Sequence, residues 1–183
     1  MGRLGYGVRH GDHVDNVLTL IGIAKAISAA NAIKADLTTL GIDLTKVKVK
    51  ICSSQEPRAV QTGGFIAAIL GIKFNGGTDE RLNPAKGLAA AMKAGHLPES
   101  GIIAAWKKNT PKNVESFSDV EERSLRVFDE SDVDVVIMVG HGGVLEPLSG
   151  MFDNSDDLRL HTGNMQSSCN LFQKKVTRIT SII

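Results

Sequence analysis

The sequence predicts an α/β fold with a mainly parallel sheet, and two observations support this prediction. Residues 132–139 (DVDVVIMV) form a short β-branched run ended by Gly140, which is typical of a strand buried on both faces. Segments with helical spacing separate this run from earlier candidate strands, and such alternation favours parallel pairing. The length of 183 residues suits one domain over 1–183.

The first half of the chain contains two predicted strand–helix units. A first strand is expected to end just before Arg9. Apolar residues then recur every three or four positions over 20–40, which predicts an amphipathic helix. Residues 46–52 begin with alternating Lys and Val and predict a second strand. A proline at its first position suits the next helix, which is expected over 57–70.

The second half of the chain is less regular before and after its central strand. Residues 84–114 show no clear period and are expected to form helices and loops over one end of the sheet. Residues 115–130 predict a helix, with Ser118 and Glu121 spaced as a capping box. Residues 168–182 predict two short strands, so the end of the chain is expected to complete the sheet.

The composition excludes several classes of function. There are 21 Lys and Arg against 20 Asp and Glu, and the net charge of +1 gives no general attraction for nucleic acid or an anionic membrane. The chain has no apolar run of about 18 residues, and its first residues lack the apolar region of a signal peptide. Cys52 and Cys169 form no CxxC pair, which indicates reduced thiols in a cytoplasmic protein. The oligomeric state is left open.

Polar and glycine residues follow three of the predicted strands, at the edge where open α/β sheets bind their ligands. These residues are Arg9-His10-Gly11, then Ser53, Ser54 and Arg58, and finally Gly140-His141-Gly142. Because the carboxyl ends of parallel strands meet at one edge, we expect the three segments to form one site. With no general excess of positive charge, this local cluster would have to hold an anionic small molecule.

These residue types suit phosphoryl transfer. A histidine nitrogen is a good nucleophile near neutral pH, since its unperturbed pKa is about 6.5. Arginine binds two phosphate oxygens at once, a protonated second histidine would add positive charge, and glycine lets the backbone approach the phosphate. A single His-Gly after a strand is more often a turn, and Arg58 alone would be a solvated residue at a helix start. The prediction therefore depends on the three segments together.

The chain also carries an ordered set of motifs that resembles the histidine phosphatase (phosphoglycerate mutase-like) superfamily. The resemblance extends over about residues 8–172, nearly the whole chain. The motifs are VRHGD at 8–12, LTxxGxA at 18–24, SSxxxRAxQT at 53–62, DERL at 79–82, ESxxDVxxR at 115–123 and VGHGGVL at 139–145. RHG alone would be a weak signal, but the complete ordered set is specific.

The resemblance implies a three-layer α/β/α sandwich of the phosphoglycerate mutase-like type. It implies a metal-independent phosphatase that needs no cofactor and acts through a phosphohistidine on a phosphomonoester or phosphoprotein. His10 would be the phospho-acceptor. The residues implied to bind the phosphate are Arg9, Asn16, Arg58, His141 and Gly142.

Two departures from the family pattern leave alternatives open. Only Val17 separates Asn16 from the LTxxG stretch, where mutase-like members carry a longer loop, and this disfavours phosphoglycerate mutase activity. Pro84 stands where the family commonly has its general acid Glu, and proline donates no proton. Glu80 lies nearby and is the remaining candidate for the catalytic set, although its usual role is structural. A catalytically weak phosphate-binding protein is therefore a second alternative.

A metal site is the other interpretation of the residues after the first motif. Asp12, His13 and Asp15 could in principle ligate a cation. The chain supplies no further ligands beside them, so we interpret this segment as a solvated loop and predict no metal.

Overall fold

The computed structural model describes residues 3–97, 102–145 and 171–176. Its main sheet has four strands in the order β4 (Val49–Ser53), β5 (Val135–Gly140), β1 (Arg3–Arg9) and β6 (Leu171–Val176). The first three of these are parallel, and β6 pairs with β1 in the antiparallel direction. The sheet is therefore mainly parallel, as predicted.

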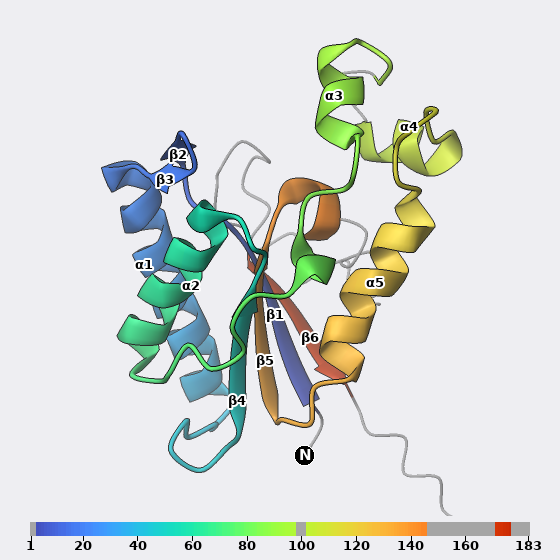
Figure 1. Cartoon of the computed structure of the whole chain (residues 1–183). Coiled ribbons are helices and arrows are strands. Elements are labelled where there is room, and N and C mark those ends of the chain that lie inside the picture. The colour runs from blue at the N-terminus through green and yellow to red at the C-terminus, as the bar shows by residue number, and fades with distance from the viewer. Residues whose placement is uncertain (1–2, 98–101, 146–170, 177–183) are drawn as a thin grey trace, which may run out of the picture.

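Helices cover both faces of the sheet and give three layers (Figure 1). On one face lie α1 (Leu20–Thr39) and α2 (Pro57–Leu70), and on the other lies α5 (Phe117–Asp129). Each face has its own apolar core, and alternate residues of the strands contribute to the two cores. In β5, for example, Ile137 packs toward α1 and α2, whereas Met138 packs toward α5.

The first strand approaches α5 closely because it carries glycine on that face. Leu4, Tyr6 and Val8 of β1 belong to the core under α1 and α2. A Cβ atom at Gly5 would lie 2.6 Å from the Phe128 ring of α5, so only glycine lets the ring pack against the strand. The Tyr6 hydroxyl donates to the Asp36 carboxylate of α1 at 2.6 Å, which satisfies its one polar group in the core.

A short hairpin connects β1 to α1. It consists of β2 (His13–Val14) and β3 (Val17–Leu18), joined by Asp15 and Asn16. Both turn residues have positive φ, 49° and 66°, as two-residue hairpin turns of type I′ require. The segment is exposed to solvent over His13–Asp15, as expected, and its backbone forms a hairpin that the sequence analysis did not predict.

The less regular segment lies at the end of the sheet where β1 and β5 finish (Figure 1). The 3-10 helix η1 (Glu80–Leu82) precedes this segment of residues 84–114, and within the segment lie α3 (Leu88–Lys93) and α4 (Ile102–Lys108). The prediction of helices and loops over one end of the sheet is confirmed. None of the helices in the described ranges combines the length and apolar character needed to cross a membrane.

Two strands begin later than predicted. The residues just before β4 and just before β5 bond to each other as loops instead of extending the strands. The second strand starts at Val49 instead of residue 46, and β5 starts at Val135 instead of residue 132. The Lys48 backbone N–H donates to the Asp134 carboxylate at 2.9 Å, and the Asp134 N–H donates back to the Lys48 carbonyl. These bonds hold together the two loops that lead into β4 and β5.

The predicted cap of α5 was wrong by two residues. Ser116 is the N-cap, and its hydroxyl accepts the backbone N–H of Asp119 at 3.1 Å. Ser118 lies inside the helix. Starting at Phe117 places that ring in the core against Trp106, with 5.3 Å between the ring centroids. Of the two strands predicted over 168–182, β6 is observed, and the remaining residues lie outside the described ranges.

A steric contact between two glycines fixes the start of α1 against the loop after β1. A Cβ atom at Gly22 would lie 2.0 Å from the backbone oxygen of Asp12, and one at Gly11 would lie 2.4 Å from the backbone oxygen of Gly22. We expect Gly22→Ala to lower the free energy of unfolding by roughly 2–3 kcal/mol, since backbone atoms must move. Urea denaturation measures this quantity.

Gly64→Ala is the matched control, because Gly64 is also a helical glycine and a Cβ atom there meets nothing within 4 Å. It should raise the free energy of unfolding by about 0.5–1 kcal/mol, since alanine favours the helix. Equal effects of the two substitutions would show that the Gly11–Gly22 contact does not restrict the backbone.

Candidate active site

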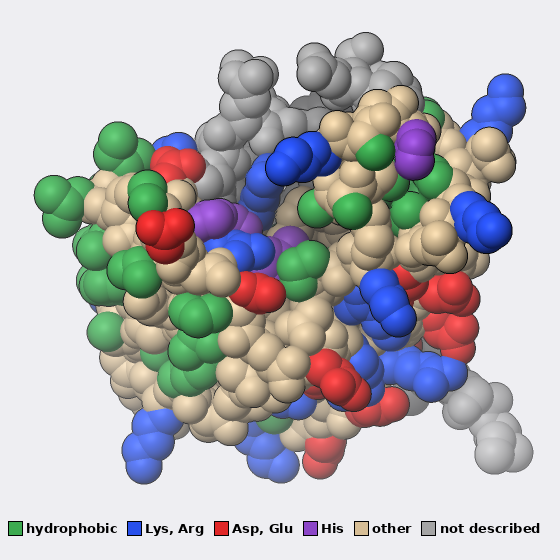
Figure 2. All heavy atoms as spheres, turned by 45° about the horizontal axis from the view of Figure 1, so that its top comes forward, with side chains coloured by type: hydrophobic (Ala, Val, Ile, Leu, Met, Phe, Trp, Pro, Cys, Tyr) green, Lys and Arg blue, Asp and Glu red, His purple; other side chains and the backbone are tan. Residues whose placement is uncertain are grey.

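Three segments that are distant in the sequence meet at the carboxyl ends of the parallel strands. His10 follows β1, Arg58 lies in the first turn of α2 after β4, and His141 follows β5. His10 and His141 are 7% and 5% exposed, and their ring centroids lie 4.9 Å apart. Figure 2 shows basic and histidine side chains together in a hollow of the surface, with acidic side chains at its edge. The predicted convergence of the three segments is observed.

The backbone around His10 is held by neighbouring elements. The His10 N–H donates to the Gly140 carbonyl at 3.0 Å, which continues the pairing of β1 with β5. The next N–H, of Gly11, donates to the Thr62 hydroxyl of α2 at 3.1 Å, and that hydroxyl donates to the Arg58 carbonyl at 2.7 Å. Thr62 therefore links the loop that carries the first histidine to the helix turn that carries the arginine.

The contacts of the His10 ring define which nitrogen carries the proton. Its Nδ1 lies 2.9 Å from the Gly11 carbonyl oxygen, to which only an N–H can bond. Its Nε2 lies 3.1 Å from Arg58 Nε, which always donates. The ring is thus neutral, with a proton on Nδ1 and a lone pair on Nε2. That lone pair is directed into the site, as a nucleophile requires.

Arg58 spans the two histidines with one edge of its guanidinium. Nε donates to His10 Nε2, and Nη2 donates to His141 Nδ1 at 3.2 Å. This Nε/Nη2 edge is the edge with which arginine binds two oxygens of one anion. The opposite end, Nη1, donates to Asn16 Oδ1 and to Glu56 Oε2, the latter at 3.1 Å.

His141 is neutral in this arrangement. Since Nδ1 accepts from Arg58, the proton sits on Nε2, which donates to the Ser54 hydroxyl at 2.7 Å. The Ser54 hydroxyl also accepts the Glu56 backbone N–H at 3.3 Å. Ser54 thus orients the second histidine from the loop after β4.

Burial and positive charge keep both rings unprotonated. Burial lowers the pKa of His10 to about 4, against a smaller opposing effect of the Gly11 carbonyl, and the charges of Arg58 and Arg9 lower it further. The pKa of His141 is also lowered, by burial first and then by His10, Arg58 and Arg9. Burial lowers the pKa of Arg58 as well. A concentration of positive charge around two neutral imidazoles attracts an anion.

The remaining predicted phosphate ligands lie in the same region. Arg9 ends β1 in register with Gly140, and its charge acts on both histidines. Asn16, in the hairpin turn, accepts a hydrogen bond from Arg58 Nη1 with its side-chain oxygen. Gly142 directly follows His141 and begins a helical turn.

Glu80 lies apart from this cluster. Its side chain is exposed, and in the described part of the chain it lines a separate hollow together with Asn83, Glu115 and Arg123. Arg123 forms an ion pair with Glu115 at 2.7 Å and donates to the carbonyls of Arg81 and Asn83, so this hollow belongs to the packing of η1 against α5. Pro84 is exposed in the same hollow.

Sequence reasoning missed several residues that hold the site together. Thr62 was noted only as part of a motif, Ser54 only as a polar residue after the second strand with no assigned role, and Glu56 was not considered. Gln61 accepts the Leu18 N–H at 2.8 Å and so ties α2 to the hairpin. His13 is exposed, as its assignment to a solvated segment predicts, but its edge-on ring contact with His10, with 5.1 Å between the centroids, was not foreseen. The Asp-Asn pair between two valines was the available signal for the hairpin.

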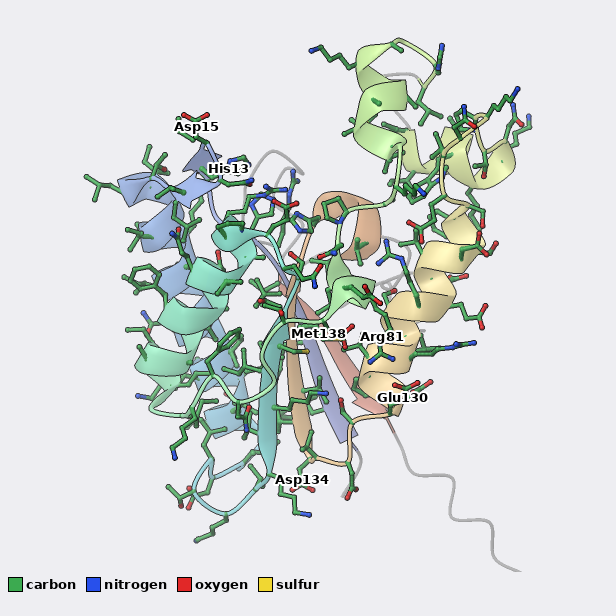
Figure 3. All side chains as sticks on the ribbon, in the orientation of Figure 1. His13, Asp15, Arg81, Glu130, Asp134 and Met138 are labelled. Carbon is green, nitrogen blue, oxygen red and sulfur yellow. The ribbon has the colours of Figure 1, made fainter. Side chains whose placement is uncertain are left out.

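The described residues contain no group of three or more His, Cys, Asp or Glu side chains placed to bind a metal. Figure 3 shows why the candidate ligands of the first loop do not converge: Asp15 points away at the hairpin tip, whereas His13 is directed toward the site. Asp12 forms an ion pair with Lys25 at 2.6 Å.

The sequence and the fold identify the class of protein. The sequence-family model of the histidine phosphatase superfamily (branch 1) matches residues 6–173. The chain therefore belongs to this superfamily. No curated protein matches the sequence. The three-layer fold and the sequence motifs therefore agree on the same family.

Two solved structures show the same fold. A phosphoglycerate mutase from Bacillus anthracis str. Sterne superposes with a TM-score of 0.62 at 15% identity, covering 93% of this chain and 86% of that one. A mycobacterial glucosyl-3-phosphoglycerate phosphatase, described as a complex with VO3, superposes with a TM-score of 0.57 at 23% identity, covering 81% and 79%. The predicted phosphoglycerate mutase-like architecture is confirmed.

Proposed function

We propose that this protein is a phosphatase that hydrolyses phosphoric monoesters through a phosphohistidine at His10, without a metal or cofactor. The observation that carries the proposal is the position of Arg58, whose bidentate edge spans the lone pairs of His10 Nε2 and His141 Nδ1. An incoming phosphate would take this edge with two oxygens and leave Nε2 beside the phosphorus. A small phosphate ester or a phosphoprotein would be the substrate.

The chemistry proceeds in two displacements. His10 Nε2 forms a bond to phosphorus while the ester P–O bond breaks, and the leaving oxygen takes a proton. Water then attacks the phosphorus, the P–N bond breaks, and inorganic phosphate leaves. Arg9 and Arg58 balance the charge on the phosphoryl oxygens in both transition states. The Gly11 carbonyl favours the cationic phosphohistidine, because Nδ1 keeps its proton and donates to it.

Protonation of the leaving oxygen limits the choice of substrate. Pro84 occupies the place where a general acid is expected, and Glu80 is exposed in the separate hollow beside Glu115 and Arg123. A general acid typically contributes roughly 10²–10⁴-fold in rate. We infer that esters with acidic leaving groups, such as p-nitrophenyl phosphate, and phosphoramidates react faster than alkyl phosphates.

The experiment that tests this proposal traps the intermediate. The protein is mixed with ³²P-labelled p-nitrophenyl phosphate in EDTA, quenched in alkali to preserve phosphohistidine, and digested. Label should appear on the peptide that contains His10, and it should disappear on a chase with unlabelled substrate. Stable label on Ser53 or Ser54, or labelling that requires added Mg²⁺ or Zn²⁺, would contradict the proposed mechanism.

A further inference from the structure

Glu56 places a carboxylate at the edge of the site, and the mechanism above gives it no role. Its Oε2 lies 3.1 Å from Arg58 Nη1, the nitrogen that faces away from both histidines. The Glu56 side chain is 35% exposed, against 14% for Arg58. The Glu56 side chain is thus more exposed to solvent than the arginine to which it is paired.

The backbone fixes this carboxylate in place. Glu56 is the N-cap of α2, directly before Pro57, and its N–H donates to the Ser54 hydroxyl. The preceding residue, Gln55, is held by the Asn83 side chain. Asn83 Oδ1 accepts the Gln55 backbone N–H at 2.9 Å, and Asn83 Nδ2 donates to Gln55 Oε1 at 2.9 Å. The backbone of Glu56 is therefore anchored, and its carboxylate is held by the ion pair with Arg58.

One consequence is the orientation of Arg58. Nη1 bonds to both Asn16 and Glu56, so this end of the guanidinium is occupied. The Nε/Nη2 edge is then the one directed at the histidines and at an incoming phosphate. Asn16 and Glu56 both accept from Nη1, but only Glu56 carries a charge.

The other consequence is electrostatic. The positive charges of Arg9 and Arg58 attract the phosphoryl group itself. The negative charge of Glu56 stands at the rim and repels any second anionic group that a substrate carries next to its phosphate. An otherwise neutral phosphate ester avoids this repulsion.

We propose that Glu56 is a specificity-determining residue, which holds the outer end of Arg58 and excludes phosphate esters with a second negative charge beside the phosphate. The preferred substrates are then phosphate esters of otherwise neutral molecules. This inference rests on the proposed phosphatase function.

Two substrates of nearly equal shape test the charge effect. Glycerol 3-phosphate and 3-phosphoglycerate differ in a hydroxymethyl group against a carboxylate. We expect the native protein to favour glycerol 3-phosphate in kcat/KM. Glu56→Gln keeps an acceptor for Arg58 Nη1 and removes the charge, so the ratio of the two kcat/KM values should move toward 3-phosphoglycerate by about tenfold.

Glu122→Gln is the matched control, because Glu122 is an exposed residue of α5 paired with Arg126. It should leave the ratio unchanged. The same ratio in Glu56→Gln, in Glu122→Gln and in the native protein would refute the charge effect while leaving the phosphatase function intact. Equilibrium binding of the two esters to each protein, measured by calorimetry, gives a second readout of the ratio that does not need turnover.

Glu56→Ala separates anchoring from charge. It removes the charge as Gln does, so the substrate ratio should shift equally, but it also removes one of the two acceptors of Nη1 and leaves only Asn16. We expect kcat for both substrates to fall at least fivefold below that of Glu56→Gln. Equal kcat in the two variants would refute the anchoring role. A native protein that neither hydrolyses nor binds either ester would refute the proposed function together with this inference.

Discussion

His10→Ala should lower kcat/KM for p-nitrophenyl phosphate by at least about 10⁴-fold, because the variant lacks the nitrogen that we propose forms the covalent intermediate. The three other groups that would bind the phosphate, Arg9, Arg58 and His141, stay in place. The variant should therefore still bind inorganic phosphate, and its loss of activity should lie mainly in kcat. Initial rates over a range of substrate concentrations, with calorimetry for phosphate binding, measure both quantities.

His96→Ala is the control for this substitution, since His96 is an exposed histidine that follows α3. It should have native activity. His10→Ala protein that retains more than about one hundredth of the native kcat would show that another group is the nucleophile.

Arg58→Lys should lower kcat/KM by roughly 10²–10³-fold, although the charge is conserved. A lysine ammonium is a point charge and cannot place two coplanar N–H groups against two oxygens, as the Nε/Nη2 edge does. It also cannot reach Asn16, Glu56 and both histidines at once. Arg58→Ala should lower kcat/KM further, because the charge is lost too.

Arg126→Lys serves as the control, because Arg126 is an exposed residue whose ion pair with Glu122 a lysine can replace. Thermal unfolding of each variant separates loss of activity from loss of structure. If Arg58→Lys retained native kcat/KM, Arg58 would contribute only its charge, and the bidentate arrangement would have no catalytic importance.

The lowered pKa of His10 also makes the stability of the folded chain depend on pH. Because burial lowers this pKa from 6.5 to about 4, the unfolded chain binds a proton more readily than the folded chain in this interval. Stability linked to His10 is therefore complete above about pH 6.5 and declines as the pH falls toward 4. The same group stays neutral, and so nucleophilic, at neutral pH.

The sequence predicted the main elements of the fold because each carries its own periodic signal. The helix at 57–70 has a proline at its start and a glycine after its end, and α2 has these bounds. The predicted cap of α5, Ser118 with Glu121 as a capping box, lies two residues after the observed N-cap, Ser116. Burial of Phe117 decided between them, and burial depends on tertiary packing that a local pattern does not contain.

The site was predicted in its composition but not in its internal contacts. The order of motifs indicated that His10, Arg58 and His141 converge, since parallel strands end at one edge. It did not indicate that Arg58 bonds to both rings or that Ser54 orients His141, because those contacts depend on side-chain direction. Glu80 was included for its position in DERL, yet its side chain is exposed in a separate hollow.

The pairing of β1 with β5 also determines when during synthesis the protein can acquire its site. Leu4 pairs with Val135, so the first strand leaves the ribosome long before its central partner exists. At roughly 5–20 residues per second, the delay is on the order of ten seconds, during which an apolar strand has unpaired backbone groups. A nascent chain that ends before Gly140 would contain the first histidine without the second, and the proposed phosphate site would stay incomplete until translation passed this point.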